Sequence, residues 1–202
     1  MSKNLPKVAI VGQANVGKSS LFNRMLKSQQ AVVAREAGTT RDSVLGKVSY
    51  KKQNFWLIDT AGLKDPNDEF EATIQEQIQD AVDASDLILV VLDSTKPFSN
   101  EDRLIAKKAL KSRKPVILVL NKTDLKGNLS NEEFVRLGVK PIVRTSAEHN
   151  SGVEDLLFEI SERIPKVREE KSEEDVIKVA LVGRPNAGKS YLFNTLAGKQ
   201  QA

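Results

Sequence analysis

The strongest chemical pattern lies near the start of the chain, where residues 12–19 read GQANVGKS. The string fits G-x-x-x-x-G-K-S, and it lies between an apolar run predicted to be a strand and an amphipathic run predicted to be a helix. Glycines let the backbone wrap closely around phosphate groups, and the N–H groups at a helix start point at the anion. Lys18 can offset the phosphate charge, and the Ser19 hydroxyl can bind a Mg²⁺ ion held by two phosphates.

We therefore predict a phosphate-binding loop followed by a helix in this segment, with Lys18 also contributing to catalysis through its charge. A glycine-rich turn that merely caps a helix is the alternative interpretation. The predicted ligands of the nucleotide here are Gly12, Asn15, Val16, Gly17, Lys18, Ser19 and Ser20.

A second polar string, Asp59-Thr60-Ala61-Gly62, follows the third predicted strand. Parallel α/β sheets bind ligands at the carboxyl ends of their strands. An aspartate there can hold the Mg²⁺ ion through water, and the Gly62 N–H can meet the terminal phosphate. We assign Asp59 to nucleotide and metal binding and Gly62 to nucleotide binding and catalysis. A simple strand-ending turn is the alternative.

A third string, Asn121-Lys122-Thr123-Asp124, can select a base. The Asp124 carboxylate can accept two hydrogen bonds, from N1–H and the exocyclic amine of guanine. Adenine lacks this donor pair and would leave the carboxylate unpaired. Asn121 can tie the base edge to neighbouring loops, and the Lys122 stem can lie along the purine plane. A helix-capping aspartate in a polar turn is the alternative.

The string Thr145-Ser146-Ala147 follows the last predicted strand. Small side chains there let backbone N–H groups reach a base carbonyl oxygen. The same residues can also simply begin a loop. The position favours the first interpretation, so we add Ser146 and Ala147 to the nucleotide ligands.

These strings are positioned by apolar runs that alternate with longer amphipathic stretches. Most of the apolar runs are continuous and need cover on both faces, which predicts an α/β fold with a six-stranded, mostly parallel sheet and helices on both faces. Because no helix separates the second and third strands, they should form an antiparallel hairpin at one edge. Strands are predicted at 8–11, 45–50, 55–59, 87–92, 116–120 and 141–144, and helices at 18–27, 70–84, 101–111, 131–136 and 153–163, with Asn100 capping the third helix and Gly138 following the fourth.

Composition excludes several classes of protein. The absence of cysteine excludes a disulfide-stapled scaffold, and a single histidine excludes a zinc finger. The longest apolar runs, 87–92 and 116–120, are too short to span a bilayer, and residues 1–6 do not form a signal peptide. We expect a soluble, monomeric, cytoplasmic protein with neither a membrane nor DNA as partner. The formal charge of +4 is weak evidence for an anionic partner, and a surface of mixed charge explains it equally well.

The opening of the chain recurs near its end. Residues 179–194 match residues 8–23 at 11 of 16 positions, which indicates a duplicated domain. The two copies are separated by the charged string KVREEKSEED, typical of a linker. We predict a first domain over 1–165, a linker over 166–176 and the truncated start of a second domain over 177–202. We expect this second copy, with one strand, one loop and one helix, not to bind nucleotide by itself.

The order of the four strings resembles that of P-loop GTPases, and the sequence is similar to their Era-like branch. Two such modules joined by a charged linker resemble the double GTPases of ribosome assembly. This resemblance implies a P-loop GTPase fold, GTP or GDP with Mg²⁺ as ligands, and the large ribosomal subunit or its RNA as partner. It also implies that Thr40, in Gly38-Thr39-Thr40-Arg41-Asp42, is a catalytic switch residue whose hydroxyl binds Mg²⁺; Thr39 competes for this role.

The sequence departs from the family at two places. Leu63 occupies the position after Asp-Thr-Ala-Gly where Ras-type enzymes carry a glutamine that orients water, so hydrolysis is expected to be slow. Gln13-Ala14 replaces the usual Arg-Pro, which we do not expect to prevent phosphate binding. Asn15 matches the asparagine that coordinates K⁺ in some relatives. A turn residue tolerant of positive φ is the alternative for that position.

The sequence therefore predicts a slow GTPase switch, in which Mg²⁺ and K⁺ help to stabilise the charge that develops on the γ-phosphate. Two alternatives remain. The first is a nucleotide-responsive binding module with negligible turnover, which Leu63 favours. The second is a P-loop ATPase or kinase.

Overall fold

The computed structural model describes residues 5–27, 32–34, 44–51, 53–59 and 79–166, together with Thr195. Contacts between Cα atoms divide the chain into two units, residues 1–167 and 168–202. All further description concerns the first unit. The predicted switch residue Thr40, its alternative Thr39 and the second copy of the phosphate-loop sequence, 183–190, lie outside the described residues.

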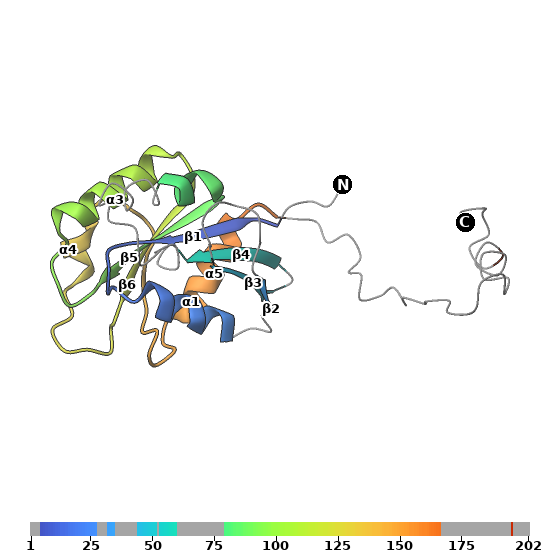
Figure 1. Cartoon of the computed structure of the whole chain (residues 1–202). Coiled ribbons are helices and arrows are strands. Elements are labelled where there is room, and N and C mark those ends of the chain that lie inside the picture. Colours follow the sequence, from blue (N-terminus) through green and yellow to red (C-terminus); the bar gives the residue numbers. More distant parts are fainter. Residues whose placement is uncertain are drawn as a thin grey trace, which may run out of the picture. The chain divides into compact units, whose positions relative to one another are not determined.

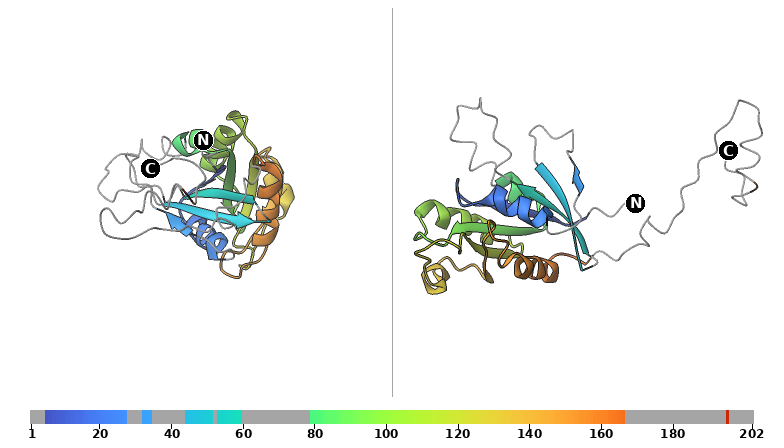
Figure 2. Two further views of the ribbon diagram at one scale, coloured as in Figure 1. Left: turned by 90° about the vertical axis from the view of Figure 1, so that its right-hand side faces the viewer. Right: turned by 90° about the horizontal axis from the view of Figure 1, so that it is seen from below.

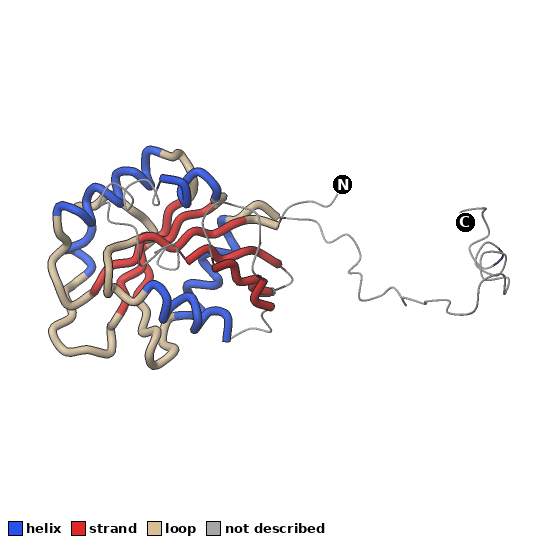
Figure 3. Tube along the Cα trace, viewed as in Figure 1, coloured by secondary structure: helices blue, strands red, loops and turns tan. Residues whose placement is uncertain are grey.

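The first unit is built around one sheet, whose strands are red in Figure 3. The strand order is β2-β3-β4-β1-β5-β6-β7. From β4 to β7 neighbouring strands are parallel, whereas β3 is antiparallel to both β4 and β2. The strands are β1 (Lys7–Val11), β2 (Val32–Ala34), β3 (Val44–Tyr50), β4 (Gln53–Asp59), β5 (Leu87–Asp93), β6 (Val116–Asn121) and β7 (Ile142–Arg144).

This sheet confirms the predicted fold class and the antiparallel β3–β4 hairpin, with one correction. The sheet has a seventh strand, β2, which pairs with β3 and takes its place at the edge. The antiparallel strand is therefore internal. β2 has three residues, too few to produce a hydrophobic period that a sequence could reveal.

Helices cover both faces of the sheet, as Figures 1 and 2 show. On one face α1 (Lys18–Lys27) and α5 (Val153–Arg163) pack with Val8 and Ile10 of β1. On the other face α3 (Asn100–Lys111), α4 (Asn131–Val135) and the helical residues 79–84 pack with Ala9 and Val11. Alternate residues of one strand thus serve the two halves of the core, which is the two-sided burial expected of a parallel strand.

The helix ends agree with the prediction at α1 and α5 and differ at α3. Ser99, not Asn100, is the N-cap: its Oγ accepts from the N–H groups of Glu101 and Asp102, while the Asp102 carboxylate accepts from the Ser99 N–H. This reciprocal capping box satisfies more backbone donors than a cap at Asn100 would. α4 ends at Val135, one residue early, and of the predicted helix 70–84 the described part, 79–84, is helical.

The topology brings the predicted polar strings to one edge of the sheet. β1, β4, β5 and β6 are parallel neighbours, so their carboxyl ends lie together. The phosphate loop follows β1, Asp59 ends β4, Asp93 ends β5 and Asn121 ends β6. No helix in the described ranges is long and apolar enough to cross a membrane.

Candidate functional site

Two glycines of the phosphate loop lie where no other residue fits. Gly12 has φ +154°, and a Cβ there would lie 2.3 Å from the Val91 carbonyl oxygen. Gly17 has φ +93°, and a Cβ there would lie 2.3 Å from Nδ2 of Asn121. The loop therefore packs its backbone directly against the ends of β5 and β6. A bare backbone of this kind is what close approach to phosphate requires.

The loop's polar side chains are placed at the start of α1. Lys18 is buried, and its ammonium donates to the carbonyl oxygen of Gln13 at 2.7 Å. Ser19 and Ser20 are exposed, so their hydroxyls can reach a ligand. Asn15 has φ +63°, a left-handed conformation that asparagine tolerates, and this fits the turn-residue alternative for that position.

Asp59 is buried at the end of β4, where it lies level with Ile10 of the adjacent β1. The carboxylate therefore ends its strand beside the phosphate loop. A carboxylate and the Ser19 hydroxyl are hard oxygen ligands, the type that Mg²⁺ combines with phosphate oxygens and water. Among the described residues there is no cluster of three acidic, histidine or cysteine side chains that could hold a metal alone. Both residues fit a magnesium ion that takes its remaining ligands from a nucleotide and water.

Asn121 joins the base-selecting strings to the phosphate loop. Its buried amide Nδ2 donates to the carbonyl oxygen of Val16 at 3.0 Å. Its Oδ1 accepts from the Thr145 hydroxyl and from the Ala147 N–H, each at 3.1 Å. One side chain therefore links three of the four polar strings, and its two atoms use both donor and acceptor functions.

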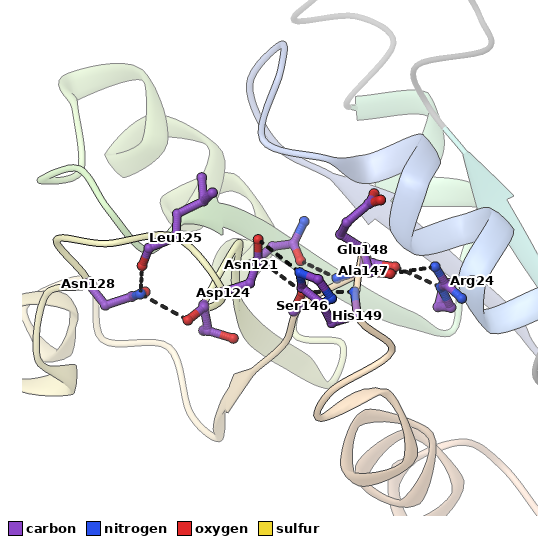
Figure 4. A network of polar contacts seen from close by, with 10 residues as sticks. Arg24, Asn121, Asp124, Leu125, Asn128, Ser146, Ala147, Glu148 and His149 are labelled. Atoms are coloured by element: carbon purple, nitrogen blue, oxygen red, sulfur yellow. Dashed lines mark hydrogen bonds and ion pairs between the residues drawn. The ribbon is translucent and has the colours of Figure 1, made fainter.

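Asp124 is held beside Ser146 (Figure 4). The Ser146 hydroxyl donates to Oδ1 of Asp124 at 2.6 Å. This hydrogen bond is the main reason why the pKa of Asp124 is lowered; burial opposes the shift, and His149 and Lys122 add to it. The side chain is 18% exposed, so part of the carboxylate faces solvent. An ionised, oriented carboxylate is what recognition of a paired N–H donor set requires.

Lys122 is paired with a residue that the sequence analysis did not single out. Its ammonium lies 2.8 Å from Oδ2 of Asp93 at the end of β5. Burial acts to raise the pKa of Asp93, but hydrogen bonds from Lys122 and Thr95 outweigh it, and the pKa is lowered. The Asp93 carboxylate is therefore ionised at neutral pH where it accepts from Lys122.

Arg24 and His149 also reach this region. Arg24 on α1 donates through Nε to the carbonyl oxygen of Ala147 and through Nη2 to that of Glu148, both at 2.7 Å. His149 lies in the loop that follows Ala147. Its side chain is 69% exposed, but its backbone N–H donates to the Ser146 hydroxyl and its Nε2 lies 4.0 Å from Oδ2 of Asp124. The contacts of Arg24 with Ala147 and Glu148, and of His149 with Asp124, join residues far apart in the sequence, so no local pattern reveals them.

The structure thus brings together the phosphate loop, Asp59, the 121–124 string and Ser146-Ala147 at one edge of the sheet. Three of the predicted site residues or their neighbours, Thr40, Gly62 and Leu63, lie outside the described residues. The arrangement offers donors and a lysine for phosphates at one end and an ionised carboxylate for a base at the other.

Comparison with known proteins identifies a matching family and similar proteins. Residues 7–122 and 178–202 match the family described as 50S ribosome-binding GTPase. GTPase Der of Gemmatimonas aurantiaca is 41% identical over 199 residues, which cover 98% of this chain and 45% of that protein. GTPase Der of Bacteroides fragilis is 43% identical over 198 residues, with 96% and 45% covered. The chain therefore spans about 45% of the length of these curated relatives.

Solved structures share the fold. The G domain of the FeoB iron transporter of T. maritima is 29% identical, with a TM-score of 0.60, over 79% of this chain and 99% of that one. The cytosolic domain of the same transporter in its GMPPNP form is 26% identical, with a TM-score of 0.58, over 82% and 66% of the two chains.

Proposed function

Since this chain belongs to the 50S ribosome-binding GTPase family, as its motifs predicted, we propose that it binds guanine nucleotides and hydrolyses GTP as a Mg²⁺-dependent switch. The observation that supports this most directly is the hydrogen bonding of Asn121, which joins the phosphate loop at Val16 to the Thr145–Ala147 loop. One nucleotide carries both the phosphates and the base, so the phosphate loop and the base-selecting loops must be held at a fixed distance from each other.

Base selection in this proposal depends on Asp124. Its carboxylate is ionised and oriented by Ser146, and it would accept from N1–H and the exocyclic amine of guanine. ATP would present an acceptor at N1 and leave the carboxylate unpaired, which costs a large factor in affinity. This favours a GTPase over the P-loop ATPase or kinase alternative.

In the reaction, water attacks the γ-phosphorus of GTP and the bond from phosphorus to the β–γ bridging oxygen breaks, which gives GDP and phosphate. Lys18 and the loop N–H groups would stabilise the charge that develops on the phosphate oxygens. Ser19 and Asp59, with Thr40, would hold Mg²⁺, which supplies further charge neutralisation when bound. The Gly62 N–H would meet the terminal phosphate.

Turnover should be slow, because the aliphatic Leu63 cannot orient the attacking water as a glutamine does. Asn15 is proposed to bind K⁺ beside the phosphates, and hydrolysis should then be faster in potassium than in sodium. Single-turnover hydrolysis measured in each salt tests both points. Equal rates in the two salts contradict the role of Asn15, and no measurable hydrolysis in either favours the binding-module alternative.

The large ribosomal subunit or its RNA is the proposed partner, supported by the family to which the chain belongs. We further propose that residues 1–165 form one GTPase domain, 166–176 a linker and 177–202 the start of a second. The separate family match at 178–202 supports this division.

One titration tests the central proposal: binding of GTP and ATP to the 202-residue chain, each with and without Mg²⁺. We expect GTP to bind at least 100-fold more tightly than ATP, about 2.7 kcal/mol, and Mg²⁺ to strengthen GTP binding. Equal binding of the two nucleotides refutes the proposal.

A further inference from the structure

A partly buried ion pair lies at the edge of the proposed guanine site. Asp93, the last residue of β5, is level with Asn121, the last residue of the adjacent β6. Oδ2 of Asp93 lies 2.8 Å from the ammonium of Lys122, and the two side chains are 11% and 29% exposed. Two neighbouring strands therefore end in residues that fix the start of the 121–124 string.

The two carboxylate oxygens of Asp93 have separate partners. Oδ1 accepts from the Thr95 N–H at 3.0 Å and from the Thr95 hydroxyl at 2.7 Å, which fixes the orientation of the carboxylate. Oδ2 is left to accept from Lys122. Thr95 thus orients the Asp93 carboxylate. The carboxylate then orients Lys122, which follows the adjacent strand β6.

The contact with Asp93 restrains the side chain of Lys122. Its backbone is left-handed, with φ +67°, and its ammonium ends a flexible four-carbon stem. A lysine that is free to rotate would lose side-chain entropy when it is fixed against a nucleotide. A lysine already held by Asp93 loses less.

We propose that Asp93 is a positioning residue of the guanine-nucleotide site, acting through Lys122, whose stem it holds in place for the purine. The inference rests on the proposed function of the site. Asp93 itself touches neither base nor phosphate in this proposal, so its effect on binding must depend on the presence of Lys122.

A double-mutant cycle on the full chain tests this dependence. Asp93→Asn keeps an acceptor for Thr95, so the turn is retained, but it removes the charge that holds Lys122. Lys122→Met keeps most of the stem and removes the ammonium. Affinity for GDP is measured for the original chain, both single variants and the double variant. We expect Asp93→Asn to weaken GDP binding about tenfold in the original chain and less than twofold in the Lys122→Met background.

Asp86→Asn is the matched control. Asp86 directly precedes β5, at the end of that strand remote from Asp93, and its carboxylate accepts from the Lys7 backbone N–H. This variant should leave GDP affinity unchanged, and thermal unfolding of every variant shows whether the fold is retained.

The outcomes separate the inference from the proposed function. If the original chain binds GDP in preference to ADP but Asp93→Asn has no effect, or has the same effect with and without Lys122, Asp93 has no positioning role. GDP binding that Lys122→Met leaves unchanged refutes the inference equally, since the lysine would then contribute nothing. If the original chain does not distinguish GDP from ADP, the proposed function fails and the inference fails with it.

Discussion

Replacing Asp124 by asparagine should change which purine the chain prefers. The Ser146 hydroxyl donates to Oδ1 of Asp124 and would keep an oxygen at that position in the variant. The amide nitrogen of the new side chain would then replace Oδ2. A donor at this point opposes the exocyclic amine of guanine, whereas it matches the carbonyl oxygen that xanthine carries at the same ring position.

The size of the effect follows from the hydrogen bond lost. Hydrogen bonds to a charged group contribute about 1.5–3 kcal/mol each, and guanine would lose the one that its exocyclic amine donates to Oδ2, because the retained oxygen still accepts from N1–H. The loss of about 1.5–3 kcal/mol corresponds to GDP binding that is weaker by about 10–150-fold. Xanthosine diphosphate should bind the variant more tightly than GDP does.

Calorimetric titration of the original chain and the variant with GDP and with xanthosine diphosphate measures this inversion. Asp83→Asn, a substitution remote from the site, serves as the control. Adding Ser146→Ala to Asp124→Asn frees the amide to rotate, so the preference for xanthosine should fall. An Asp124→Asn variant that still prefers GDP would show that this carboxylate does not select the base.

Three further perturbations have defined outcomes. Gly17→Ala places a Cβ against the Asn121 amide at positive φ, so it should destabilise the fold by about 1–3 kcal/mol and abolish GDP binding; an unchanged melting temperature contradicts this. Arg24→Met removes both hydrogen bonds that the guanidinium donates to the carbonyl oxygens of Ala147 and Glu148, so GDP affinity should fall about tenfold in titration, and full affinity would exclude Arg24 from the site. The lowered pKa of Asp93 means that its ionised form stabilises the fold above the ordinary aspartate pKa and that this stability is lost as pH falls through the lower folded value. Urea unfolding should therefore show a decline in stability that begins near pH 4 and is smaller in Asp93→Asn; equal slopes would contradict it.

Much of the fold could be predicted because the elements satisfy local and tertiary requirements at once. Helices 18–27 and 153–163 have the predicted limits, since their apolar faces supply much of one half of the core. The third helix shows the limit of such reasoning. Ser99 and Asn100 are both good caps, and the choice depended on the Asp102 side chain that completes the capping box.

The residues of the candidate site, too, could be predicted only in part. Residues within one string, such as Asp124, are recognisable because their chemistry depends on neighbours in sequence. Arg24, Asp93 and His149 are not, because each meets its partner only after folding: Arg24 and Ala147 are 123 residues apart. A single sequence carries no sign of such pairs.

The bond between Asn121 and Val16 also bears on how the molecule comes into being. These two residues are separated by 105 positions. The Oδ1 atom of Asn121 accepts from the N–H of Ala147, which lies further along the chain. During synthesis the phosphate loop emerges early, but the hydrogen bonds of Asn121 can form only after most of this unit has left the ribosome. A growing chain would therefore bind a guanine nucleotide only late in synthesis. Binding would indicate that β6 and the loop before α5 have packed in place.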